Sequence, residues 1–175
     1  RTGGPVAHEF ARTGHLHADC GVALVFVPHL QNTYANGATY WMDNGRPVIQ
    51  LSVRHKWCDV IFFTFFHEIG HILRHLHTEI FIEYPDSDDR KEKEADSYAA
   101  QALMPSDSYS KFLANRSLLT PASVESFAGD MGVHPCVVVG RLQRDQRLSY
   151  RDYRFNGLKP RFELMMQEEK NSQHV

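Results

Sequence analysis

The segment His67-Glu68-Ile69-Gly70-His71 combines residue types that can carry out metal-assisted hydrolysis. If the segment is helical, the two histidines lie one turn apart on one face, with Cβ atoms about 6 Å apart. Two imidazole nitrogens at that spacing can converge on one tetrahedral zinc ion. Glu68 beside them can take a proton from a metal-bound water as the water attacks a carbonyl, and can return it to the leaving amine. The pattern therefore predicts His67 and His71 as metal ligands and Glu68 as a general base.

Chance is a weak explanation for this motif. A chain with 11 His and 10 Glu among 175 residues should contain only about 0.04 copies of it by accident. If the motif had arisen by chance, the two histidines would be partly buried core or surface-edge residues. His75 continues the four-residue series, but it lies about 12 Å along the helix axis from His67, too far to share the ion. We expect His75 and His77 to be surface residues or to support the ligands.

A catalytic zinc takes three protein ligands and keeps one position open, so the third ligand is expected on another element. A second helix is predicted over 89–104 from an apolar stripe formed by Ala95, Tyr98, Ala99, Ala102 and Leu103. Glu92 lies within about 50° of the centre of this stripe, whereas Glu94 lies about 110° away and faces water. A buried glutamate needs a partner such as a metal ion, which makes Glu92 the predicted ligand.

Two alternatives remain open on this helix. Asp89-x-x-Glu92 also fits a capping box, in which Glu92 would serve the helix start instead of a metal. Asp96, one turn later, can accept the outer N–H of a ligating histidine or lie on a solvated helix edge.

The elements that carry these helices predict an α+β fold. Apolar segments bounded by turn signals predict strands at 21–28, 38–42 and 47–53, which we expect to form a small antiparallel sheet. The histidine-bearing helix is predicted from Val60 to about His77, with Asp59 as its cap. A short strand or turn at 80–84 and an exposed loop at 85–89 follow, and two further short helices are predicted at 121–127 and 135–142. The sheet should pack on the two site helices, with a helical C-terminal part.

Length and composition indicate one packed domain. The chain has 175 residues, 42% of them hydrophobic and 23% charged, and a net charge of −2 excludes a strongly basic nucleic-acid-binding body. The densest apolar run, 60–66, is too short to span a bilayer, so no membrane segment is expected. We expect a lead-in or linker at 1–20, the domain at 21–162 with its helical part from 106, and a tail at 163–175. The start at Arg1 suggests a piece of a longer chain.

The three cysteines, Cys20, Cys58 and Cys136, lie far apart and form neither a C-x-x-C pair nor an even disulfide framework. Free thiols in a reducing cytosol, and hence a cytoplasmic protein, are the simplest interpretation.

Three segments together resemble the ImmA/IrrE family of gluzincin-type metallopeptidases. They are the motif at 67–71, the stretch from Glu92 to Pro105 (E-x-E-A-D-x-Y-A-A-x-x-L-M-P) and the stretch 137–142 (V-V-V-G-R-L). The resemblance covers about 21–162. Segments 21–28, 37–41 and 50–54 are similar to the subgroup fused behind a helix-turn-helix domain of the XRE or HigA type, found in antitoxins and transcriptional regulators. That domain is missing from this sequence, and DNA would be contacted only through it.

The resemblance implies a zinc cofactor with His67, His71 and Glu92 as ligands and Glu68 as general acid and base. It also implies that an edge strand pairs with an extended peptide above the zinc, for which Ala38–Met42 is the candidate. The partners it implies are protein or peptide substrates, among them repressors and other regulators; a homodimer is left open. The group that stabilises the oxyanion is not identified. Tyr98 and His134 are candidates, although each is more often a packing or capping residue.

A rival hypothesis is a regulatory sensor or partner-binding module that keeps the zinc fold without proteolysis. Residues 124–143 have the spacing of a helix-turn-helix, and 141–161 carry seven Lys/Arg against two Asp, a local net of +5. Alternatively, these helices pack on the peptidase core and the arginines form a solvated or structural face. The intact Glu68 favours an enzyme, because a structural zinc would take a fourth ligand where a catalytic zinc keeps an open position.

Overall fold

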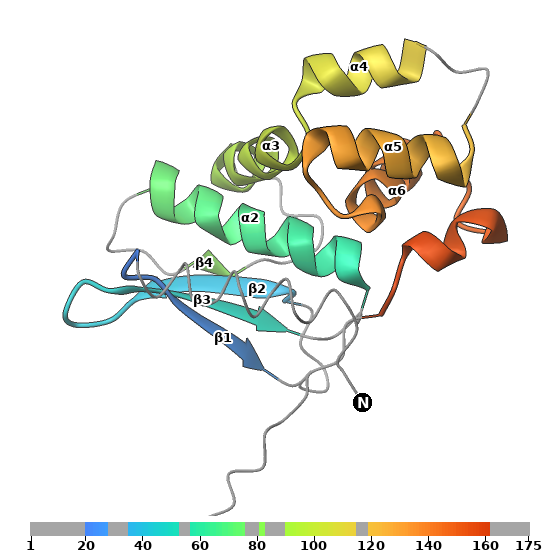
Figure 1. The fold of residues 1–175 in the computed structure, drawn as a ribbon. Coiled ribbons are helices and arrows are strands. Elements are labelled where there is room, and N and C mark those ends of the chain that lie inside the picture. Colours follow the sequence, from blue (N-terminus) through green and yellow to red (C-terminus); the bar gives the residue numbers. More distant parts are fainter. Residues whose placement is uncertain are drawn as a thin grey trace, which may run out of the picture.

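A computed structural model describes residues 20–27, 35–52, 57–75, 81–82, 90–114 and 119–161. Its strands are β1 (Ala23–Val27), β2 (Gly37–Trp41), β3 (Pro47–Ser52) and β4 (Phe81–Ile82). Its helices are α2 (Cys58–Arg74), α3 (Arg90–Leu103), α4 (Ser106–Ala114), α5 (Pro121–Met131), α6 (Pro135–Arg144) and the 3-10 helix η2 (Tyr153–Leu158). Figure 1 shows α2 lying across one face of the sheet, with the other helices beyond it. The α+β class is confirmed, and no described helix is long and apolar enough to cross a membrane.

The sheet is mixed, with the strand order β1-β3-β2-β4, so the expectation of an antiparallel sheet is wrong for one pairing. The turn through Gly45, which has a φ of 77°, joins β2 to β3 as an antiparallel hairpin. β3 then inserts between β2 and β1, and it pairs with β1 in parallel, with Ala23 opposite Val48. The alternation of residue types predicts which segments are strands, but it does not say which strands are neighbours.

The predicted peptide-binding edge strand is also wrong, because β2 is an inner strand among the described residues. β3 lies on one side of β2, and on the other side Ala38 and Thr39 pair with Ile82 and Phe81 of β4. The sequence marks 80–84 as a short strand or turn, which is confirmed, but its position beside β2 depends on tertiary contacts.

Helix α2 begins two residues earlier and ends three residues earlier than expected. Its N-cap is Trp57, which makes no side-chain cap hydrogen bond, and its C-cap is His75. Asp59 is therefore not the cap: it lies in the first turn, and its Oδ2 is 2.8 Å from Lys159 Nζ. An acidic residue there is stabilised by the positive end of the helix dipole without capping it.

The C-terminal part is helical, as expected. α5 and α6 contain the two predicted helices, and α5 begins with a capping box between Thr120 and Ser123 and ends at Gly132, whose φ of 66° is left-handed. α4 and η2 are additional. The lead-in 1–19, the loop 85–89, His77 and the tail 163–175 lie outside the described residues.

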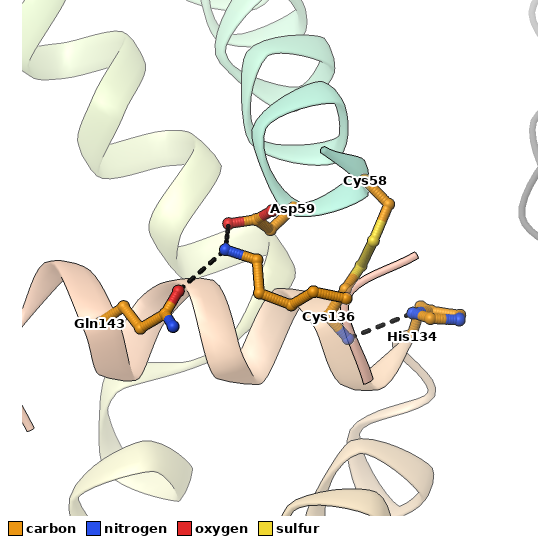
Figure 2. The surroundings of a disulfide bond; sticks show 6 residues. Cys58, Asp59, His134, Cys136 and Gln143 are labelled. Carbon is orange, nitrogen blue, oxygen red and sulfur yellow. Dashed lines mark hydrogen bonds and ion pairs between the residues drawn. A yellow bond between two sulfur atoms is a disulfide. The ribbon is translucent and has the colours of Figure 1, made fainter. Parts of the chain in front are cut away.

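Cys58 and Cys136 form a disulfide bond, which contradicts the expectation of three free thiols; Cys20 is free and exposed. Figure 2 shows the bond joining the start of α2 to the start of α6. Both cysteines are fully buried, and their Cα atoms are 6.4 Å apart, within the normal range for a disulfide. They are 78 residues apart in the chain, so only the packing of α6 on α2 brings them together.

The core lies between the sheet and the helical layer. On the sheet side it contains Ile49 and Leu51 of β3, and on the α2 side Ile61 and Phe65, all nearly inaccessible to solvent. Val138 of α6 continues this core into the C-terminal helices. The α2 residues of the motif, which follow Phe65 directly, are therefore held on a helix that is packed on both sides.

Candidate metal centre

Helices α2 and α3 are in close contact at Gly70 and Ala95. A Cβ atom on Gly70 would lie 3.0 Å from the Ala95 Cα and 3.2 Å from the Ala95 carbonyl oxygen. Because Gly70 has no side chain, the two helix backbones can come close enough for short polar side chains on each to meet. Gly70 lies between His67 and His71, and Glu92 lies one turn before Ala95.

The three predicted ligands are brought together at this crossing. His67 Nε2 is 3.0 Å from His71 Nε2 and 3.1 Å from Glu92 Oε2, and His71 Nε2 is 3.5 Å from Glu92 Oε1. Ligand atoms about 2.0–2.1 Å from a tetrahedral zinc ion are about 3.3 Å apart from one another. The nitrogen and oxygen atoms thus have both the chemistry and the spacing of a three-ligand metal site.

Burial and charge favour the forms of these side chains that bind metal. The side chains of His67 and His71 are 2% and 1% exposed, and burial lowers the pKa of His71, so that its imidazole is neutral at pH 7. Burial by itself would raise the pKa of Glu92, but hydrogen bonds from His67 and His71 outweigh it and lower that pKa to about 2. A neutral imidazole and an ionised carboxylate are the forms that coordinate a cation.

Glu92 and Glu94 lie as the helix geometry predicts, one toward the histidines and the other toward solvent. The Glu92 side chain is 14% exposed. That of Glu94 is 44% exposed, and its Oε1 lies 3.4 Å from Arg90 Nε. Glu92 is in the first turn of α3, so a capping role is compatible with its position, but Asp89 lies outside the described residues.

His67 and His71, the two predicted histidine ligands, each have a partner on the outer nitrogen. Asp96 Oδ1 is 2.8 Å from His67 Nδ1, and His75 Nδ1 is 3.0 Å from His71 Nδ1. Such contacts fix the ring orientation, and with Nε2 directed at the metal site the Nδ1–H of each ligand becomes the donor. The side chain of His75 is only 4% exposed, so of the two roles left open by the sequence it takes the supporting one.

Glu68 is fully buried between α2 and β2. The Thr39 hydroxyl donates to Glu68 Oε2 at 2.6 Å and lies 3.3 Å from the Glu68 backbone oxygen. The Glu68 Oε1 atom occupies the space that a Cβ on Gly37 would need. Thr39 was not identified from the sequence. The signal was available, because Gly37 and Thr39 alternate on the buried face of β2, the face that α2 covers.

The two candidates for oxyanion stabilisation have other contacts. His134 is the N-cap of α6: its Nδ1 accepts from the Cys136 backbone N–H at 3.1 Å, and its ring stacks on Phe62. Tyr98 is half-buried beneath the guanidinium of Arg74, which lies 5.7 Å from the ring centre. His134 also lies within 4.8 Å of the two cysteine sulfurs, but those sulfurs are bonded to each other.

Burial speaks against DNA recognition by α6. α5 and α6 are joined by a short turn at Gly132, as the helix-turn-helix spacing suggests. Six of the ten α6 residues are buried, however, whereas a recognition helix must expose a face to the major groove. Several nearby cations also have acidic partners, such as Arg141 with Asp145 at 2.9 Å and Arg154 with Asp152 at 2.7 Å.

The sequence matches no protein-family model and no curated protein. The function therefore has to be inferred from the site itself.

Proposed function

We propose that this chain is a zinc-dependent metallopeptidase domain that hydrolyses a peptide bond in a regulatory protein. The observation that carries the proposal is the convergence of His67, His71 and Glu92, with Glu68 buried directly after His67 in the chain. The resemblance to the ImmA/IrrE family supports the same chemistry and suggests a cytoplasmic regulator or antitoxin-type protein as its setting.

The chain's own residues would divide the work of hydrolysis. A zinc ion bound by the three ligands would lower the pKa of a bound water to about 7 and polarise the carbonyl of the bond to be cut. Asp96 and His75 hold the ligand rings in position. Glu68 would accept the proton of the attacking water and deliver it to the leaving amine, with its Oε2 held by the hydrogen bond from the Thr39 hydroxyl.

Metal content tests the site before any substrate is known. We expect about one zinc per chain by elemental analysis of the wild type and much less in His67→Ala and Glu92→Gln. Glu125→Gln is the control, since it makes the same change at an exposed position of α5 and should keep its zinc, whereas Glu94 lies 3.4 Å from His75, which contacts His71. A wild type that takes up no metal from added zinc, or a Glu92→Gln variant with full occupancy, would contradict the proposed site.

Hydrolysis is tested separately with Glu68→Gln. This variant should retain zinc, because Glu68 is not among the grouped ligands, but should lose cleavage of a peptide library by at least about a hundredfold. If the wild type binds zinc but cleaves no peptide, the rival hypothesis of a non-proteolytic sensor or partner-binding module is favoured instead.

A further inference from the structure

A pocket of about 270 Å³ lies between α2, α3 and α6, on the side of the metal centre that faces the C-terminal helices. Its walls are mainly apolar and include Val60, Phe63, Leu103, Met104 and Val137. This volume is below the roughly 300–1,000 Å³ of sites that enclose a whole small-molecule ligand, and it suits one bulky side chain.

The residues that line the pocket adjoin those of the metal centre along α2 and β2. Phe63 and Thr64 line it from α2, one turn before His67 and Glu68, and the Phe63 ring centre is 6.4 Å from that of His67. Asn36 lines it from the start of β2, next to the Gly37 backbone that contacts Glu68.

The pocket lining also adjoins the metal centre along α3. Ala100 lines the pocket one turn after Asp96, whose carboxylate contacts His67. A peptide held at the metal would therefore have a side chain within reach of this pocket.

The charges around the pocket leave its mouth positive. Asp59 is paired with Lys159 at 2.8 Å, and Arg141 with Asp145 at 2.9 Å. Arg144 lies over the Phe63 ring, 4.6 Å from its centre, and in the part of the chain that the structure describes it has no carboxylate partner. A cationic side chain entering here would meet an unbalanced positive charge.

The geometry points to a specificity pocket that receives a bulky uncharged side chain, aromatic or large aliphatic, from the substrate residue next to the bond held at the metal, with Arg144 excluding cationic side chains. This inference rests on the proposed peptidase function and adds the class of substrate to it.

Two kinds of probe separate the pocket from the metal. N-acetyl-L-phenylalaninamide, added to the metal-free chain, should shift the amide NMR signals of Ala100 and Gly140, which both line the pocket, whereas N-acetyl-L-lysinamide should not. Peptide hydroxamates that differ only in one side chain, methyl, benzyl or aminobutyl, should bind the zinc-loaded chain, with the benzyl compound at least tenfold tighter than the methyl one.

Two pairs of variants assign the effect to named residues. Ala100→Phe fills the pocket and should reduce the preference in binding affinity for the benzyl over the methyl hydroxamate to below threefold. Ala102→Phe, at an exposed position on the same helix, should leave this preference unchanged. Arg144→Gln should improve binding of the aminobutyl compound at least threefold. Arg147 lines a different pocket, so Arg147→Gln should not improve it.

Failure of the pocket and failure of the proposed function give different results. Hydroxamates that bind with equal affinity whatever their side chain, or a benzyl preference that survives in Ala100→Phe, would overturn the pocket while leaving the metal site intact. If no hydroxamate binds the zinc-treated chain, the metal site fails. The link between the pocket and a scissile bond is then overturned too, even if the phenylalaninamide shifts persist.

Discussion

Replacing Gly70 by alanine should disturb the metal centre without touching a ligand. The added Cβ would lie 3.0 Å from the Ala95 Cα, and ordinary contact begins at 3.4 Å, so the helices must separate by about 0.4 Å. His71 follows Gly70 directly, and Glu92 is one turn from Ala95, so the separation acts on ligand atoms that are now 3.0–3.5 Å apart. Metal sites tolerate deviations of only about 0.2 Å in ligand distances, and we expect zinc affinity to fall at least about tenfold.

The effect on stability has two opposing parts. Overpacking at a tight contact typically destabilises by about 1–3 kcal/mol, while replacing glycine by alanine inside a helix stabilises by about 1 kcal/mol. Gly70→Ala in the metal-free chain should therefore lie between no change and a loss of about 2 kcal/mol. Gly129→Ala, in α5 with nothing within 4 Å of its Cβ position, isolates the second part and should stabilise by up to about 1 kcal/mol.

Urea unfolding of both variants, together with zinc titration against a competing chelator, measures the two quantities. The expected result is a difference of about 1–3 kcal/mol between the two glycine replacements, with weaker zinc binding in Gly70→Ala only. If Gly70→Ala gains as much stability as Gly129→Ala and binds zinc as tightly as the wild type, then the close helix crossing does not set the ligand geometry.

Three further predictions concern the disulfide, the acid sensitivity of the metal site and the support of the general base. The Cys58–Cys136 bond links residues 78 positions apart and so restricts the unfolded chain. Reducing it removes this restriction and should lower the free energy of unfolding by about 4 kcal/mol in urea melts, whereas Cys20→Ser should leave that free energy unchanged. Burial lowers the pKa of His71, so its folded form prefers the neutral ring. Stability of the metal-free chain should therefore fall as pH drops below the unfolded value of 6.5, and zinc, which also needs the neutral ring, should be released over the same range in a dialysis series. Thr39→Val should keep zinc but lower kcat for peptide cleavage about tenfold, and Thr39→Ser should restore it.

The parts of the fold that depend on local pattern could be predicted from the sequence. The helical spacing of Ala95, Tyr98, Ala99, Ala102 and Leu103 predicts α3 and its buried face. Ala95, Ala99 and Leu103 are buried and Tyr98 is half-buried, whereas Ala102 is exposed. The strands at 37–41 and 47–52 follow from alternation and from the turn at Gly45. These features need only near neighbours in the chain, and for that reason they are visible without a structure.

The parts that depend on distant neighbours could not be predicted in the same way. The parallel pairing of β1 with β3, and the position of β4 beside β2, follow from how the hairpin docks. The disulfide depends on the packing of α6 against α2, and the hydrogen bond from Thr39 to Glu68 depends on the face of the sheet that α2 covers. Residue type and spacing carry no information about these contacts, because each joins residues at least 25 positions apart in the chain.

Glu92 shows how far a local argument can reach toward a tertiary contact. Helix geometry alone turns Glu92 inward and Glu94 outward, because successive residues are about 100° apart. A buried carboxylate needs a positive or metallic partner, and His67 and His71 are the two buried imidazoles on the facing helix α2, so they are the groups that can provide this contact. What the pattern lacks is the distance between the helices, and Gly70 supplies it: the one residue of the motif without a side chain lies where the α3 backbone must pass. The ligand set and the glycine within the motif are thus two consequences of a single helix crossing, and for that reason the Gly70→Ala experiment tests the metal centre as a whole.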